Sequence, residues 1–222
     1  MQTTAKQKGY KGLPMEGVIA TWYAHITEGD ARAYRACAAA VAGRLRPGAG
    51  VLEVAPGPGY LAIELARLGD FRVTGLDISH SFVRIAGENA RKAGVSIDFR
   101  QGNASRMPFE DGTFDAIVCR AAFKNFSDPA GALKEMHRVL RPGGVASVFD
   151  LRRDAPRDAV DAHVEEMGLS GLNTALTKLT FRFMLLRTAY PRAAMEQMAA
   201  QTPFGAWELL DDGIGFELQL VK

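Results

Sequence analysis

The stretch "VLEVAPGPGY", residues 51–60, changes from an apolar run into a loop that ends any strand. The loop is Pro-Gly-Pro-Gly, and it follows an acidic residue, Glu53, near the end of the run. In α/β sheets, ligands bind beyond the carboxyl ends of the strands, often at the first strand-to-helix turn. Gly57 and Gly59 would let a ligand approach the main chain, and the next helix would point free N–H groups at it. A carboxylate beside such a helix N-terminus suits a ligand that carries both an ammonium and a carboxylate.

On both sides of this loop, short runs rich in branched and aromatic residues alternate with helical stretches. The expected strands are 50–55, 71–77, 95–102, 114–120 and 143–151, and the expected helices between them are 58–68, 79–93 and 128–140. Asp128 followed by Pro129 predicts the start of the last helix. The alternation indicates right-handed crossovers. We therefore predict an α/β fold with a doubly wound, mostly parallel, Rossmann-like sheet.

The flanking segments predict helices and a closing strand pair. Two N-terminal helices are expected, the first with an apolar stripe at helical spacing, and Asp30 is expected to cap the second. The stripe comprises Met15, Val18, Ile19, Trp22, Tyr23 and Ile26. Later helices are expected at 156–168, 172–188 and 191–201, and the middle one has a predicted core stripe of Leu172, Leu176, Leu179, Phe183 and Leu186. The last residues predict two strands joined through Asp211-Asp212-Gly213, which brings the sheet to seven strands with a final antiparallel one.

Length and composition favour one domain. We expect a single domain over 1–222, with cap helices at 1–48, a ligand-binding core at 49–150, a helical lid at 151–204 and closing strands at 205–222. The net charge of +2 is spread over mixed charges, so no nucleic-acid partner is expected. The two cysteines lack metal-ligand spacing, and no metal site is expected. The lack of a disulfide pattern fits a reducing cytoplasm, and no signal peptide or membrane span is predicted, so no membrane partner is expected.

Four stretches together resemble the class I S-adenosylmethionine-dependent methyltransferases. They are "VLEVAPGPGY", "VTGLDIS", "FRQGNASRMPFEDGTFDAIVCRAAF" and "DPAGALKEMHRVLRPGGVASVFD", within about residues 50–150. The resemblance implies S-adenosyl-L-methionine as cofactor. Asp77 ends the second strand about 20 residues beyond the glycines, where a carboxylate can accept hydrogen bonds from ribose hydroxyls. The cofactor-binding residues implied by the resemblance are Tyr23, Glu53, Ala55, Gly57, Gly59, Asp77, Ile78, Asn103, Ala104, Cys119 and Arg120, the last two through main-chain groups.

The sequence departs from the family pattern at three places. Ala55 replaces the usual first glycine of the loop, so a close approach of ligand to main chain is in doubt there. Asn103 stands where many relatives have an aspartate, although its amide oxygen can still accept a hydrogen bond. The histidine that relatives often carry after the fourth strand is missing from "AAFKNFSD". The general base is therefore open, and the candidates are His25 and Lys124.

The expected reaction is in-line methyl transfer to a small apolar or aromatic molecule, driven mainly by positioning. Candidate acceptor contacts are Phe123 and Phe126 after the fourth strand, and Phe181 and Met184 in the lid, which is predicted to select the acceptor. Phe181, Met184 and Leu185 fall outside the core stripe of the 172–188 helix and form a second apolar surface. This surface could face an apolar substrate, more core, or a partner chain in a homodimer. Two other functions stay open: a nicotinamide-dependent reductase, and a protein that binds S-adenosylmethionine without catalysis.

Overall fold

The computed structural model describes residues 9–11, 14–166, 168, 170–180 and 185–222. These residues contain one mixed sheet of seven strands in the order β3-β2-β1-β4-β5-β7-β6. The strands are β1 (Gly50–Val54), β2 (Arg72–Asp77), β3 (Asp98–Gln101), β4 (Phe114–Arg120), β5 (Leu140–Leu151), β6 (Ala206–Asp212) and β7 (Gly215–Val221). The first five strands pair in parallel, and β7 is antiparallel to both of its neighbours. The predicted doubly wound fold is confirmed.

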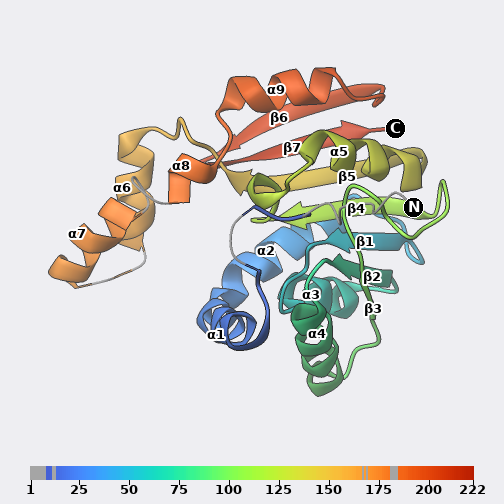
Figure 1. The fold of residues 1–222 in the computed structure, drawn as a ribbon, viewed down its shortest axis with the longest axis horizontal. Coiled ribbons are helices and arrows are strands. Elements are labelled where there is room, and N and C mark those ends of the chain that lie inside the picture. Colours follow the sequence, from blue (N-terminus) through green and yellow to red (C-terminus); the bar gives the residue numbers. More distant parts are fainter. Residues whose placement is uncertain (1–8, 12–13, 167, 169, 181–184) are drawn as a thin grey trace, which may run out of the picture.

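Helices cover both faces of the sheet (Figure 1). On one face, α2 (Ala31–Ala42) and α3 (Tyr60–Leu68) bury alanines and leucines against β1, β2 and β4. On the other face, α5 (Pro129–Val139) and α9 (Arg192–Ala200) pack on the core around Leu52 and Ile117. The inner parallel strands β1 and β4 are thus buried from both sides, which explains their continuous apolar sequences, whereas the edge strand β3 is mostly exposed.

Two predicted helix starts have different outcomes. Asp128 precedes α5 and its Oδ1 accepts a hydrogen bond from the Gly131 N–H at 2.9 Å, while Pro129 occupies the first turn, as predicted. Asp30 stands at the N-cap of α2, but its side chain makes no capping hydrogen bond there. A short 3-10 turn, Glu28–Asp30, joins α1 (Gly17–Thr27) to α2 directly. The Asp30 carboxylate is left available for another role.

The predicted apolar stripe of the first helix is mostly wrong. Val18 is 85% exposed and Trp22 is 60% exposed, and Ile19 and Ile26 are exposed as well. The buried residues of α1 are Ala20 and Ala24, which pack on Phe82 and Ile85 of α4 (His80–Ala93). Small side chains let the two helices approach closely, so alanines form the contact and the larger apolar residues face outward. Only Met15 and Tyr23 of the predicted stripe pack against this cluster.

The helical segment after β5 divides into two parts. α6 (Arg157–Glu166) and α7 (Gly171–Thr180) project beyond the sheet at the end where β5 leaves it (Figure 1). Leu176 and Leu179 of α7 are exposed, so this part of the predicted core stripe is wrong. α8 (Leu186–Thr188) returns to the sheet and buries Leu186 with Val160 and Ile214. Phe183 lies outside the described residues, and the side chain of Leu172 is not described.

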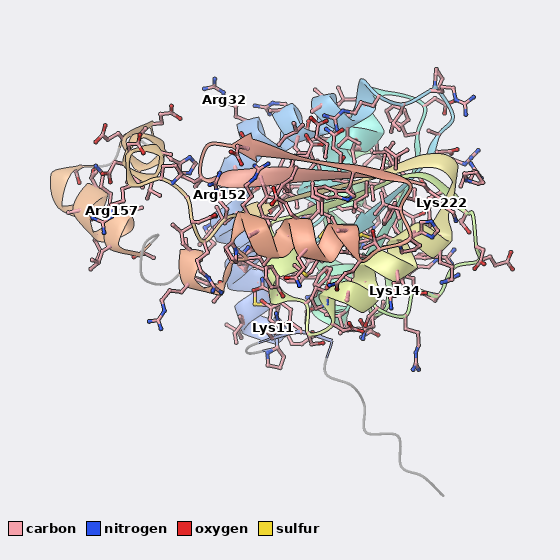
Figure 2. The ribbon with its side chains drawn as sticks, turned by 90° about the horizontal axis from the view of Figure 1, so that it is seen from above. Lys11, Arg32, Lys134, Arg152, Arg157 and Lys222 are labelled. Atoms are coloured by element: carbon pink, nitrogen blue, oxygen red, sulfur yellow. The ribbon has the colours of Figure 1, made fainter. Side chains whose placement is uncertain are left out.

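Basic side chains are spread over the molecule. Figure 2 labels Lys11, Arg32, Lys134, Arg152, Arg157 and Lys222, which lie on widely separated parts of the structure. Among the described residues, no helix combines the length and apolar character needed to span a bilayer.

Candidate functional site

A cavity of about 650 Å³ lies at the carboxyl ends of β1, β2 and β4. One wall is formed by the loops that follow these strands and β3, from Glu53 through Pro58 to Ala122. The opposite wall comes from the N-terminal segment, including Tyr10, Met15 and residues of α1 and α2. Helices α1 and α2 therefore close a cleft that the sheet opens at its switch point between β1 and β4.

The glycine loop after β1 presents bare main chain to this cavity. Gly57 has a positive φ of 55°, and a Cβ built there would meet nothing within 4 Å. Gly59 also has a positive φ, but a Cβ there would lie 2.9 Å from the Ala86 Cβ, and Gly59 does not line the cavity. Its glycine is needed for packing of α3 against α4. The expected close approach of a ligand is therefore supported at Gly57 and not at Gly59.

Alanines occupy two strained positions at the cavity wall. Ala55 and Ala121 both have φ of 58°, a left-handed conformation that glycine adopts most easily. Ala55 lies where the family pattern has a glycine, and its N–H donates to the Leu76 carbonyl at 2.8 Å. The loop thus keeps a glycine-like backbone despite the substitution. Ala121 directly follows β4, and its N–H donates to the Phe149 carbonyl at 2.7 Å.

Asp77 is held at the end of β2 by main-chain donors. Its Oδ2 accepts from the Gly57 N–H at 3.0 Å and its Oδ1 from the Ser79 N–H at 2.8 Å. Burial raises its pKa to about 6, although these hydrogen bonds oppose the shift. A carboxylate has lone pairs for about four hydrogen bonds, so both oxygens can still accept from a ligand. The two bonds fix the glycine loop and the carboxylate in one orientation.

Glu53 is the most unusual polar group in the cavity. It is 3% exposed, and its Oε2 has no hydrogen-bond partner among the described residues. Burial raises the pKa of Glu53 to about 8; the nearby negative charge of Asp77 also raises it, and Arg120 lowers it. A buried carboxyl oxygen without a hydrogen-bond partner destabilises the folded protein, and a cationic ligand group that bonds to it would remove this penalty.

The far side of the cavity is polar and aromatic. Tyr23 and Thr27 of α1, Asp30, and Tyr34 of α2 line it. Burial raises the pKa of Tyr34 to about 12, so its phenol stays a hydrogen-bond donor at neutral pH. Apart from Tyr23, these residues were not predicted. A signal was present, because positions 23, 27, 30 and 34 recur at helical spacing as a polar and aromatic stripe.

The two candidate bases do not line the cavity. The side chain of His25 is 85% exposed, and its Nδ1 lies 4.0 Å from a Glu28 oxygen. Lys124 is buried, and its Nζ donates to Asp150 Oδ1 at 2.7 Å and to the Ala121 carbonyl at 2.9 Å. An ammonium ion paired in this way holds the strained Ala121 turn in place rather than accepting a proton. The structure thus differs from both expectations.

The other predicted site residues separate into three groups. Ile78, Asn103, Ala104, Arg120 and Phe126 line the cavity, as do the loop residues already described. Cys119 and Phe123 are fully buried in the core and do not reach it. Phe181 and Met184 lie outside the described residues. None of the described residues between 151 and 204 lines the cavity, so the wall expected from the helical lid is built by α1 and α2 instead.

Comparison with known proteins gives a consistent result. Residues 52–148 match the model of the family described as methyltransferase domain. The chain is 36% identical over 140 residues to a demethylmenaquinone methyltransferase of Chlorobaculum tepidum, an alignment that covers 63% of this chain and 54% of the relative. It is 41% identical over 138 residues to the demethylmenaquinone methyltransferase of Deinococcus radiodurans, covering 62% and 52%. The chain spans about half the length of the curated relatives that it matches.

Solved structures share the fold. A candidate S-adenosyl-L-methionine-dependent methyltransferase from Methanococcus maripaludis superposes with a TM-score of 0.75 at 21% identity, covering 96% of this chain and 95% of that one. A SAM-dependent methyltransferase from Aquifex aeolicus gives a TM-score of 0.63 at 18% identity, covering 80% and 84%. With the sheet order, these likenesses show that the chain has the fold of S-adenosylmethionine-dependent methyltransferases, and residues 52–148 resemble the methyltransferase domain in sequence.

Proposed function

We propose that this protein transfers a methyl group from S-adenosyl-L-methionine to a small apolar molecule with an aromatic ring. The observation that carries the proposal is the division of one cavity into two ends. One end has the buried carboxyl groups of Glu53 and Asp77 next to the main chain of Gly57, which no side chain covers. The other end has tyrosines from α1 and α2 and the exposed carboxylate of Asp30, in the turn that joins these helices. The first end suits the cofactor and the second suits an acceptor.

The residues at the first end fit the cofactor. Asp77 retains acceptor capacity for ribose hydroxyls, and the orphaned Glu53 Oε2 would receive the ammonium of the methionyl tail. Asn103 and Ala104 would meet the adenine, with Ile78 packing on its face. The Asn103 Oδ1 already accepts from the Ser105 N–H and hydroxyl, each at 3.0 Å, which fixes the orientation of this amide.

The bound cofactor supplies an activated methyl group on a sulfonium, so the protein mainly has to hold an acceptor in line with it. Positioning of this kind can contribute roughly 7 to 11 kcal/mol. Helices α1 and α2 cover the cleft and place Tyr23 and Tyr34 on its wall. Asp30 projects from the junction of these helices and makes no capping bond. We assign it the role of accepting a proton from the acceptor, in place of His25 and Lys124.

The acceptor end favours a flat ring. Tyr10, Tyr23, Tyr34 and Phe126 give the wall aromatic faces and edges, against which a ring can pack in offset or edge-to-face contact. The relatives named demethylmenaquinone methyltransferase act, by that name, on a quinone. We propose a hydroquinone ring as the acceptor class. Cytoplasmic location, homodimer formation and the lack of nucleic-acid or membrane partners stay predictions.

The proposal is tested by incubating the full chain with methyl-labelled S-adenosylmethionine and a panel of acceptors. The panel contains a reduced naphthoquinone with a free ring position, a catechol, a primary amine and a thiol. Labelled product and S-adenosylhomocysteine should form in equal amounts with the naphthoquinol, and Asp77→Ala should abolish both at limiting cofactor. Cofactor binding without transfer to any member would contradict the proposal and favour a non-catalytic binding protein. Protection against heating by NADH rather than S-adenosylmethionine would favour a reductase.

A further inference from the structure

Arg120 is a partly buried cation that faces the cavity without an ionic partner. No ion pair or hydrogen bond of its side chain is found among the described residues; its guanidinium carbon lies 4.8 Å from the centre of the Tyr34 ring. Along β4, Ala116 and Val118 pack toward α2 and α3, and Arg120 continues the same face two residues further. The guanidinium is therefore carried past the sheet into the cavity wall.

Glu53 stands beside Arg120 on the neighbouring strand. β1 pairs with β4 so that Glu53 is opposite Val118. Arg120 is two residues further along β4 and therefore lies on the same face of the sheet, beyond Glu53 on the adjacent strand. With strands about 4.8 Å apart and about 3.3 Å per residue, the two Cα atoms are roughly 8 Å apart. The two side chains are close enough for Arg120 to lower the pKa of Glu53, yet Glu53 Oε2 remains without a hydrogen-bond partner. A guanidinium and a carboxyl group that share a wall without pairing leave room for a ligand that carries both a carboxylate and an ammonium.

We infer that Arg120 binds the carboxylate of the methionyl tail while Glu53 binds its ammonium, so that the pair clamps a zwitterion. This inference rests on the proposed function. A guanidinium matches a carboxylate with two parallel N–H donors, and such charge-assisted bonds are short and strong. Stacking on Tyr34 fixes the plane of the guanidinium. Because the Tyr34 ring also belongs to the acceptor wall, Arg120 lies where the cofactor end of the cavity meets the acceptor end.

The clamp is tested with two ligands that differ only in the tail. S-adenosylhomocysteine carries the amino-acid group, and 5′-methylthioadenosine lacks it. Arg120→Met keeps most of the side-chain length and removes the charge. Calorimetry should show affinity for S-adenosylhomocysteine falling about 10- to 150-fold, the effect of losing hydrogen bonds to a charged group, while affinity for methylthioadenosine changes less than about twofold. The affinity of Arg120→Lys for S-adenosylhomocysteine should lie between those of the wild type and Arg120→Met, because the ammonium keeps the charge but lacks the two parallel N–H donors of a guanidinium.

Arg32→Met is the matched control, because Arg32 is an exposed arginine on α2 that does not line the cavity (Figure 2). It should leave both affinities unchanged. Equal losses for both ligands in Arg120→Met would overturn the clamp, since they would indicate a damaged pocket. Unchanged binding of S-adenosylhomocysteine with a raised KM for the acceptor would also overturn it and place the acceptor's oxygen on Arg120.

A double variant separates the clamp from an internal ion pair. Glu53→Gln alone should also weaken S-adenosylhomocysteine and spare methylthioadenosine. If each residue holds its own end of the tail, the fold-losses of Glu53→Gln and Arg120→Met multiply in the double variant. If the double variant binds S-adenosylhomocysteine no more weakly than either single variant, the two side chains act by pairing with each other, which would contradict the inference. Failure of the wild type to bind either ligand would instead contradict the proposed function.

Discussion

Helices α1 and α2 and the pair α6 and α7 were both expected to cover the carboxyl ends of the strands, and only the first pair does. α1 packs on α4 through Ala20 and Ala24, and α2 packs on the sheet, so both become cavity wall. α6 and α7 carry apolar residues at the same helical spacing, yet they project past the sheet with Leu176 exposed (Figure 1). Helical periodicity predicts a helix in both regions, but it does not tell which surface will be covered.

The two regions differ in the polar contacts that fix them to the rest of the protein. α1 is tied to the core by specific polar contacts: the Glu16 carboxylate accepts from the His80 and Ser81 N–H groups, each at 2.9 Å, and the Ser79 hydroxyl donates to the Met15 carbonyl at 2.6 Å. These bonds tie the start of α1 to the start of α4, next to Asp77. The α7 helix makes its ion pairs with α6, from Lys178 to Asp161 and Glu165, rather than with the sheet. The first region should therefore influence the site, and the second should not.

The largest expected effect concerns α9, which belongs to the predicted lid but packs as core. Met195 is fully buried against the sheet, so Met195→Ala should lower the free energy of unfolding by about 2 to 5 kcal/mol, measured in urea. Affinity for S-adenosylhomocysteine in native buffer should stay the same. A change in acceptor preference with unchanged stability would contradict this and place Met195 at the acceptor pocket.

Asp30 tests the role of the α1–α2 junction in the reaction. If its carboxylate accepts a proton from the acceptor, Asp30→Asn should lower kcat about 100-fold, at the low end for loss of a general base. Affinity for S-adenosylhomocysteine should change less than about twofold. Glu28→Gln is the control, since Glu28 is exposed in the same turn and does not line the main cavity. Equal losses in the two variants would show that only local charge matters.

The raised pKa of Glu53 predicts that cofactor binding depends on pH. In the free protein Glu53 keeps its proton below a pKa of about 8, whereas an adjacent ammonium favours the ionised form. Binding should therefore release a proton, and affinity for S-adenosylhomocysteine should rise by up to about tenfold per pH unit between pH 6.5 and 8. Calorimetry in buffers of different ionisation enthalpy measures the released proton. Glu53→Gln should show neither effect; a pH-dependence that survives in it would point to Asp77.

Glu53 should also affect the stability of the free protein in a defined direction. Between its ordinary pKa of 4.5 and the folded value of about 8, the folded chain holds a proton that the unfolded chain has lost. The contribution of Glu53 therefore makes the free protein less stable as pH rises through this window. Glu53→Gln should flatten that slope in urea titrations at pH 5, 6 and 7.

The smallest effects are expected at the exposed apolar residues of both regions. Trp22→Ser on α1 and Leu176→Ser on α7 should each change the free energy of unfolding by less than about 0.5 kcal/mol, because neither side chain loses buried contacts. A loss that grows with protein concentration would instead reveal a second copy covering that surface. That result would support the expected homodimer and identify which helix forms it.

Local sequence patterns were sufficient for the central fold and for one half of the site. β4 was predicted with its bounds, and β1 and β2 to within one residue, because buried parallel strands are continuous apolar runs that end at glycine, proline or charge. Asp77 and the glycine loop could be located because their geometry depends on strand ends a few residues away.

The other half of the site depended on contacts between distant segments. Whether Ala20 or Trp22 is buried depends on the surface of α4 against which α1 packs. Whether Arg120 forms an ion pair depends on the side chains that α2 places next to it, and the neighbour there is the ring of Tyr34. His25 and Tyr23 are two residues apart on one helix, so the chain's periodicity alone makes either a candidate for the site. Packing of α1 places Tyr23 in the cavity and leaves His25 exposed. Burial depends on both surfaces of a contact, and the sequence of a helix specifies only one of these two surfaces.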